Sequence, residues 1–61
     1  MDKIEYYKTY KITYKLSTKL GDITVSGYAW PSRNDNGELI WTHCEDSTIV
    51  PNKYILDYRK I

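Results

Sequence analysis

Apolar and polar residues alternate along the N-terminal third of the chain with the period of a β-strand. Every second position from Tyr10 to Leu16 is apolar, and the positions between them carry Lys or Thr. Successive side chains of a strand point to opposite faces. The spacing of Tyr6, Tyr10 and Tyr14 also fits a helix, but the Thr, Tyr and Ile content favours a strand. We expect an apolar face with Tyr6, Tyr10, Ile12, Tyr14 and Leu16, and a polar face with Tyr7, Thr9, Lys11, Thr13 and Lys15.

The next segment, residues 21–30, alternates in the same way and is expected to pair with the first as a hairpin. With Leu20 and Gly21 at the tip, the apolar pairs are Leu16–Val25, Tyr14–Gly27 and Ile12–Ala29. On the polar face, this register predicts the pairs Lys19–Asp22, Lys15–Ser26, Thr13–Tyr28 and Lys11–Trp30, which include an ion pair and a cation near an indole. A slip by one residue would expose both apolar faces to water.

The remaining segments predict a loop, two short strands and a last element with two interpretations. The cluster PSRNDNG predicts a loop from Pro31 to Gly37. Residues 38–43 are expected to form a strand with apolar groups on both faces, and residues 48–50 a fourth strand that ends before Pro51. Residues 52–61 fit a strand, which we favour, or a helix with Asn52 as its N-cap.

Together, these elements predict a mostly β fold. Because a small sheet must protect its edges, we expect a five-stranded antiparallel barrel, SH3-like or OB-like, that spans residues 1–61 as a single small domain. The alternative is a four-stranded antiparallel sheet with a C-terminal helix. A chain of 61 residues buries only about 60% of the surface that its unfolded form exposes, so the margin of stability is thin.

The stretch IVPNKYI, residues 49–55, resembles the end of an SH3 domain, in which an apolar-Pro-x-x-Tyr-apolar sequence occurs. In that family the proline and the tyrosine belong to the groove that binds polyproline ligands. The resemblance implies a barrel architecture, with Pro51 and Tyr54 at a groove. It covers seven residues, and the Ala-Leu-Tyr-Asp-Tyr opening and acidic loop typical of the family are missing from this chain.

Cysteine content and hydropathy predict an intracellular, cytoplasmic protein. The lone cysteine, Cys44, has no partner for an internal disulfide, and no apolar stretch approaches the roughly 20 residues that span a bilayer. The N-terminus MDKIEYY lacks the basic start and apolar stretch of a secretory signal. We therefore expect no membrane association.

Charged residues are distributed unevenly along the chain, although the net charge is only +1. Residues 1–20, 21–50 and 51–61 carry net charges of +3, −4 and +2. Such segments can complement one another across a sheet, which needs no external partner. The near-neutral total also weakens any prediction of general polyanion binding.

Metal binding and catalysis are not expected. The contiguous residues His43, Cys44, Glu45 and Asp46 cannot all converge on one tetrahedral ion, and paired Cys or His spacing is missing. His43 would point away from its neighbour Cys44 on a strand, so the pair does not form an activated nucleophile. We predict a non-enzymatic protein without a metal or a small-molecule cofactor.

The aromatic residues carry the functional prediction. The chain has seven tyrosines, two tryptophans and no phenylalanine, so every ring has a polar group suited to a border between core and water. Half-exposed tyrosines can simply roof a small core. Large rings on a polar face are less usual, and the hairpin register places three there beside two lysines. The predicted binding residues are Tyr7, Lys11, Lys15, Tyr28 and Trp30.

These residues predict a small binding module whose partner is a protein, because Trp, Tyr and Arg dominate interface hot spots. Heavy use of Lys, Ile, Tyr and Asn is typical of AT-rich genomes, which suggests an inhibitor encoded by a phage or mobile element. The alternative is a β-barrel that stacks single-stranded nucleic acid on the same rings, with Lys53 and Arg59 among the phosphate contacts. Homodimerisation through an edge strand or Trp30 is a third interpretation.

Overall fold

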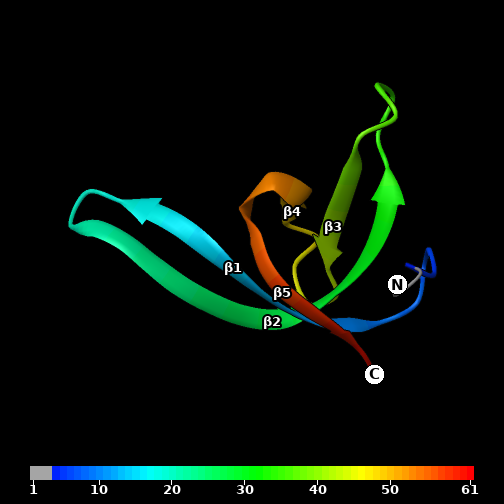
Figure 1. Ribbon diagram of the computed structural model, residues 1–61, viewed down its shortest axis with the longest axis horizontal. Coiled ribbons are helices and arrows are strands. Elements are labelled where there is room, and N and C mark those ends of the chain that lie inside the picture. Colours follow the sequence, from blue (N-terminus) through cyan, green and yellow to red (C-terminus); the bar gives the residue numbers. More distant parts are fainter. Residues whose placement is uncertain (1–3) are drawn as a thin grey trace.

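Five antiparallel strands form one sheet in the order β4-β3-β2-β1-β5 (Figure 1). The computed structural model describes residues 4–61. The strands are β1 (Tyr10–Thr18), β2 (Gly21–Arg33), β3 (Leu39–His43), β4 (Ile49–Pro51) and β5 (Ile55–Lys60). The prediction of a mostly β antiparallel fold is confirmed. No ladder joins the edge strands β4 and β5 within these residues, so the sheet is open and the predicted closed barrel is not confirmed.

The last segment is a strand, as favoured, and the alternative with a C-terminal helix is wrong. One 3-10 turn, η1 (Asn52–Tyr54), links β4 to β5, and β5 then pairs with the first half of β1. Pairing with β1 satisfies the backbone groups that a helix would otherwise have bonded internally. Among residues 4–61 there is no helix with the length and apolar character needed to cross a bilayer.

The β1–β2 hairpin has the predicted faces, but its turn lies one residue earlier than predicted. Lys19 and Leu20 form the turn, and Gly21 follows it with a φ of 118°. Residues with a Cβ rarely adopt such a φ, so the position directly after the turn favours a glycine. The hydroxyl of Thr18 closes the same turn by donating to the carbonyl of Gly21 at 2.6 Å.

The earlier turn shifts the register by two residues, which changes each partner but leaves every side chain on its predicted face. The observed apolar pairs are Tyr10–Ala29, Ile12–Gly27, Tyr14–Val25 and Leu16–Ile23. The observed polar pairs are Lys11–Tyr28, Thr13–Ser26 and Lys15–Thr24. The predicted ion pair between Lys19 and Asp22 is also wrong, because Asp22 pairs with Lys15 at 2.9 Å.

Strand β2 belongs to two halves of the sheet. Residues 21–29 pair with β1, and residues 29–33 pair with β3. The strand bends between these parts, so β3 and the end of β2 rise steeply from the line of β1 in Figure 1. The hairpin continues beyond the other strands as a projecting two-stranded ribbon (Figure 1). We call residues 15–24 the arm and the remaining described residues the body.

Pro31 lies inside β2, although the sequence predicted that a loop begins there. Its carbonyl accepts a hydrogen bond from the backbone N–H of Tyr7 at 3.0 Å. The N and C=O of one strand residue point to the same side, so the proline nitrogen faces away from β3. The missing N–H therefore costs no β2–β3 hydrogen bond, and the strand can continue through the proline.

The loop between β2 and β3 is confined to residues 34–38. The side-chain oxygen of Asn34 accepts hydrogen bonds from the backbone N–H groups of Asn36 and Glu38, each at 2.9 Å. This is the self-bonding turn chemistry that the sequence indicated, placed three residues later than predicted. Strands β3 and β4 then follow within one residue of their predicted positions.

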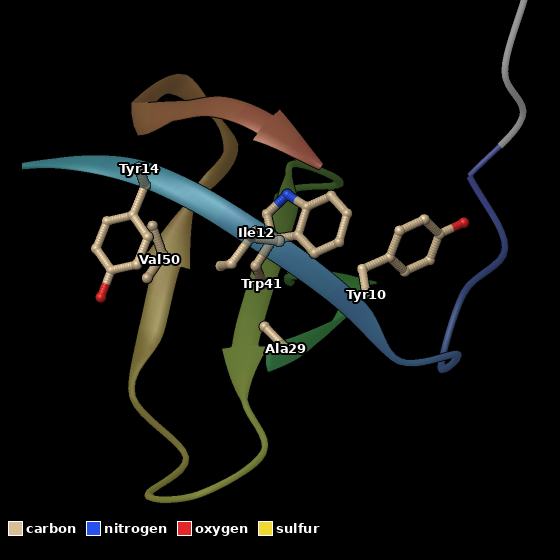
Figure 2. Close-up of a cluster of buried hydrophobic side chains, with 6 residues drawn as sticks. All are labelled: Tyr10, Ile12, Tyr14, Ala29, Trp41 and Val50. Atoms are coloured by element: carbon tan, nitrogen blue, oxygen red, sulfur yellow. The ribbon is translucent and has the colours of Figure 1, made fainter. Parts of the chain in front are cut away.

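Six buried hydrophobic side chains form the core and are shown in Figure 2: Tyr10, Ile12, Tyr14, Ala29, Trp41 and Val50. Trp41 is fully buried, and its ring meets that of Tyr10 edge-on with 5.3 Å between the centroids. The indole N–H donates to the side-chain oxygen of Asn52 at 2.9 Å, so its polar group is satisfied within the core.

Only part of the predicted apolar face of β1 is buried. Tyr10, Ile12 and Tyr14 lie in the core, as expected. Tyr6 precedes the strand and is 40% exposed, and Leu16 is 45% exposed. The two residues were predicted on the apolar face but lie outside the core, because the chain before Tyr10 leaves the sheet and Leu16 lies on the arm, beyond the part of the face that Trp41 and Val50 cover.

Candidate binding surface

The face of the sheet opposite the core carries a row of three long side chains. Lys11 on β1 lies directly opposite Tyr28 on β2, and on its other side it lies opposite Arg59 on β5. Directly opposed residues of antiparallel strands share a face, so the three side chains form a line across three strands. Tyr28 is 54% exposed. We call the surface made by Lys11, Lys15, Tyr28, Trp30 and Arg59 the outer face.

Tyr7 reaches the outer face by a different route from the predicted one. It lies in a turn before β1, with a φ of 65°, and not in the strand itself. Its backbone hydrogen bond to Pro31 holds it beside the end of β2. The ring then stacks at a tilt on Trp30, with 5.6 Å between the centroids and 33° between the planes. Tyr7 remains 73% exposed, while Trp30 is half-buried.

Lys15 lies at the arm end of the outer face, where Asp22 neutralises it. The Lys15 ammonium donates to Asp22, and the hydroxyl of Ser17 donates to the same carboxylate at 3.0 Å. These hydrogen bonds, with that from Lys15 the larger, hold the pKa of Asp22 below its usual value. Lys15 is therefore less available to an external anion than Lys11.

Acidic residues interrupt the cations of the outer face. A shallow groove of about 250 Å³ lies over the row and is lined by Lys11, Thr13, Ser26, Asp57 and Arg59. Arg59 is 3.6 Å from Asp57, and both side chains are largely exposed. Exposed pairs of this kind contribute little energy and leave the guanidinium free to reorient. The outer face thus presents mixed charge around aromatic rings.

The structure brings all five predicted binding residues to one side of the sheet, as two pairs and a separate lysine. Tyr28 and Lys11 are neighbours, Tyr7 and Trp30 are stacked, and Lys15 lies farther along β1. The predicted contact of Lys11 with Trp30 is wrong, because the two-residue shift puts Tyr28 opposite the lysine. Arg59 was predicted only as a phosphate contact in the nucleic-acid alternative. It reaches the outer face through the pairing of β1 with β5, and the sequence of residues 52–61, which fits a strand or a helix, did not predict that register.

A larger cleft of about 750 Å³ opens between the hairpin and the β3–β4 turn, along residues 25–28 of β2, and Tyr28 also lines it. His43 Nε2 and the hydroxyl of Tyr14 are 2.9 Å apart at its wall. Gly27 lies below the His43 ring, and a Cβ there would be 2.9 Å from the ring carbon Cε1. Within residues 4–61, His, Cys, Asp and Glu side chains do not gather in groups of three or more that could hold a metal ion.

Three residues of the SH3-like stretch line one cleft of about 290 Å³ beside β1: Ile49, Pro51 and Tyr54. Pro51 ends β4, and Tyr54 ends η1. Tyr54 is 44% exposed and can contact a ligand. Trp41 is fully buried and cannot take part in binding. The chain matches none of the protein-family models, curated proteins or solved structures with which it was compared.

Proposed function

We propose that this protein is a non-enzymatic binding module that recognises a protein partner through the outer face. The observation that supports this most directly is the row Tyr28, Lys11 and Arg59, which presents an exposed ring between cations on the side of the sheet away from the core. The stacked pair of Tyr7 and Trp30 adds a second aromatic contact. Strands hold the row and Trp30, and a backbone hydrogen bond to Pro31 holds Tyr7, which lowers the entropy cost of binding.

Mixed charge on this face supports a protein partner over a nucleic acid. Asp22 and Asp57 lie among the cations and would repel a phosphate backbone. Protein interfaces instead accept both signs of charge around a centre of Tyr, Trp and Arg. Such a surface on a small sheet is suited to blocking a larger protein, and an inhibitor from a phage or mobile element remains our proposal for its biological role.

We also propose two further features that the sequence predicted: an SH3-like arrangement of the strands and a cytoplasmic site of action. An SH3-like arrangement is supported by the strand order and by the 3-10 turn before the last strand. A cytoplasmic site of action is supported by the single free thiol of Cys44, since disulfides are rare in that compartment.

Capture from an extract of the source cell, with the bound proteins identified by mass spectrometry, tests the proposal. Wild type is compared with Tyr28→Ala and Lys11→Ala, and each variant has a matched control away from the outer face. Tyr54→Ala removes a tyrosine of similar exposure, and Lys19→Ala removes an exposed lysine at the hairpin turn. We expect Tyr28→Ala to weaken one specific interaction about tenfold or more, and Tyr54→Ala to leave it intact.

Equal capture by Tyr28→Ala and wild type, with both folded by circular dichroism, would contradict the proposal. Titration of labelled single-stranded DNA and RNA at about 50 and 200 mM salt tests the competing function. Binding that falls steeply with salt and is lost in Lys11→Ala would show that the outer face serves nucleic acid instead. We expect no such binding.

A further inference from the structure

The ladder between β1 and β5 stops before β1 ends. Tyr14 and Ile55 are the last pair, yet β1 continues to Thr18. An extra residue in β5, Leu56, causes the register change at this point, while β1 stays regularly paired with β2 along its whole length. The edge of β1 over residues 15–18 therefore has no neighbouring strand on the β5 side among residues 4–61.

Backbone direction shows which groups face this edge. The carbonyl of Thr9 accepts a hydrogen bond from the N–H of Ile61, so the backbone groups of Thr9 point toward the β5 side. Residues two apart along a regular strand point the same way. By this alternation the N–H and C=O of Ser17 also point to the β5 side, three residues beyond the last pair. They lie at an open strand edge, which can accept another strand.

A cleft runs along the same edge. One wall is formed by four consecutive residues of β1, from Tyr14 to Ser17, and the other by Ile49, Pro51 and Tyr54. Consecutive residues of a strand alternate between its faces, so a cleft that touches all four follows the edge and not one face. Since β2 occupies the opposite edge of β1, the cleft of about 290 Å³ lies where an added strand would run.

The chemistry of the cleft is apolar with a basic rim. Leu16, Ile49 and Tyr54 are 45%, 57% and 44% exposed, an unusual concentration for a small domain. Among the described residues that line this cleft, Lys15 is the only one charged at neutral pH, and Asp22 already pairs with it. The ammonium of Lys53 lies 5.2 Å from the ring centroid of Tyr54 and supplies the basic rim. None of the described lining residues is acidic. Alternate side chains of an incoming strand would thus meet apolar and basic surroundings.

We propose that residues 15–18 of β1 form a second docking site, which binds an extended segment of another protein as a sixth strand. The segment would alternate apolar residues, which enter the cleft, with acidic residues near Lys53. Strand addition of this kind obtains affinity from backbone hydrogen bonds and specificity from alternate side chains. A second copy of the chain fits less well, because pairing two arms would bring Lys15 and Lys19 of both copies together.

This site goes beyond the proposed function, because it uses the edge of β1 and not the outer face. Its test is selection of random linear peptides displayed on phage, followed by affinity measurement with the best synthetic peptide. We expect selected peptides to alternate apolar and acidic residues. Ser17→Pro removes the N–H at the free edge and should weaken the peptide by about tenfold or more. Ser17→Ala keeps that N–H, loses only the side-chain bond to Asp22, and should bind like wild type.

A measurement on the wild-type protein covers the case in which Ser17→Pro fails to fold. The same peptide, methylated on alternate backbone nitrogens, cannot donate ladder hydrogen bonds and should lose about tenfold or more in affinity. Selection of proline-rich or basic peptides, equal binding of the methylated peptide, or a concentration-dependent dimer abolished by Ser17→Pro would each overturn the proposal. Tyr28→Ala should leave peptide affinity unchanged, so this test and that of the outer face can fail separately.

Discussion

The arm and the body share one hydrophobic pattern but differ in what covers it. Ile12 in the body is 0% exposed, whereas Leu16 and Ile23 in the arm are 45% and 48% exposed. All three lie on the same face of the β1–β2 hairpin. The body brings Trp41 and Val50 over that face, whereas no strand within residues 4–61 covers the arm (Figures 1 and 2). Alternation thus determines which face is apolar, and the tertiary fold determines how much of it is buried.

This difference assigns most of the stability to the buried core of the body and leaves the apolar residues of the arm free to bind. An isolated two-stranded ribbon is at best marginally stable in water. The arm is held by its cross-strand ladder and by polar contacts at the turn, including Ser17–Asp22 and Lys15–Asp22. Its apolar side chains contribute little to the core and remain available for contact with another molecule. We therefore expect mutations of the buried core to affect folding, and mutations of the apolar residues in the arm or of the outer face to affect binding.

The largest predicted effect follows from Trp41→Ala in the body. Removing a fully buried tryptophan costs about 3–5 kcal/mol. A domain of this length has a total stability of roughly 3–9 kcal/mol, so the variant should lose about half or more of its stability and unfold at a much lower urea concentration. Leu16→Ala in the arm should cost less than about 1 kcal/mol, because the side chain already faces water. Urea denaturation followed by circular dichroism measures both.

Trp41→Phe serves as a control, since it keeps an aromatic ring but loses the hydrogen bond to Asn52. It should fall between wild type and Trp41→Ala. Similar destabilisation by Leu16→Ala and Trp41→Ala would show that the arm is packed against something in solution and would remove the distinction between the two regions.

A smaller effect is predicted for Gly27→Ala, where the hairpin passes His43. The new Cβ would lie 2.9 Å from the imidazole Cε1, so the ring must move and its contact with the Tyr14 hydroxyl must lengthen. We expect a loss of about 1–3 kcal/mol from this overpacking. In the background of His43→Ala the ring is gone, and the same glycine change should cost much less. A double-mutant cycle in urea measures the coupling, and purely additive effects would mean that the ring does not restrict this position.

The fold was predictable wherever local pattern was sufficient. Alternation from Tyr10 to Leu16 gave the faces of β1, and the self-bonding residues around Asn34 gave a loop. The predicted hairpin register was wrong because it placed Gly21 at the tip of the turn. In the structure Gly21 follows the turn, where it adopts a φ of 118°. The strand position of Pro31 depended on the direction of its nitrogen relative to β3, which only the assembled sheet determines.

The candidate surfaces were predictable to different degrees. The alternation of side chains along each strand was sufficient to place Lys11, Tyr28 and Trp30 on one face, because a register error of two residues does not change the face of a side chain. Arg59 required the β1–β5 pairing, and Tyr7 required a turn before β1 that its neighbours in sequence do not indicate. The free edge at Ser17 depends on where β5 ends, so no pattern within β1 could reveal it.

The smallest predicted effect compares one exposed ion pair in each region as the pH falls. Hydrogen bonding to Lys15 lowers the pKa of Asp22 in the arm from 3.8, and hydrogen bonding to Lys60 lowers the pKa of Glu5 in the body from 4.5. A carboxyl whose pKa is lower in the folded state stabilises the fold above its unfolded pKa, and that stabilisation is lost as pH falls through the folded pKa. Both contributions should thus be present above about pH 5 and disappear toward pH 2.

Melting temperatures of Asp22→Asn and Glu5→Gln across this pH range distinguish the two regions. Each variant should melt below wild type near pH 6, and the difference should vanish at the acid end. Glu5→Gln should have the larger effect, because its pair ties the chain before β1 to the end of β5, whereas the arm can open locally while the body stays folded. A larger effect of Asp22→Asn would mean that arm and body unfold as one unit, and their separate roles would then lose their physical basis.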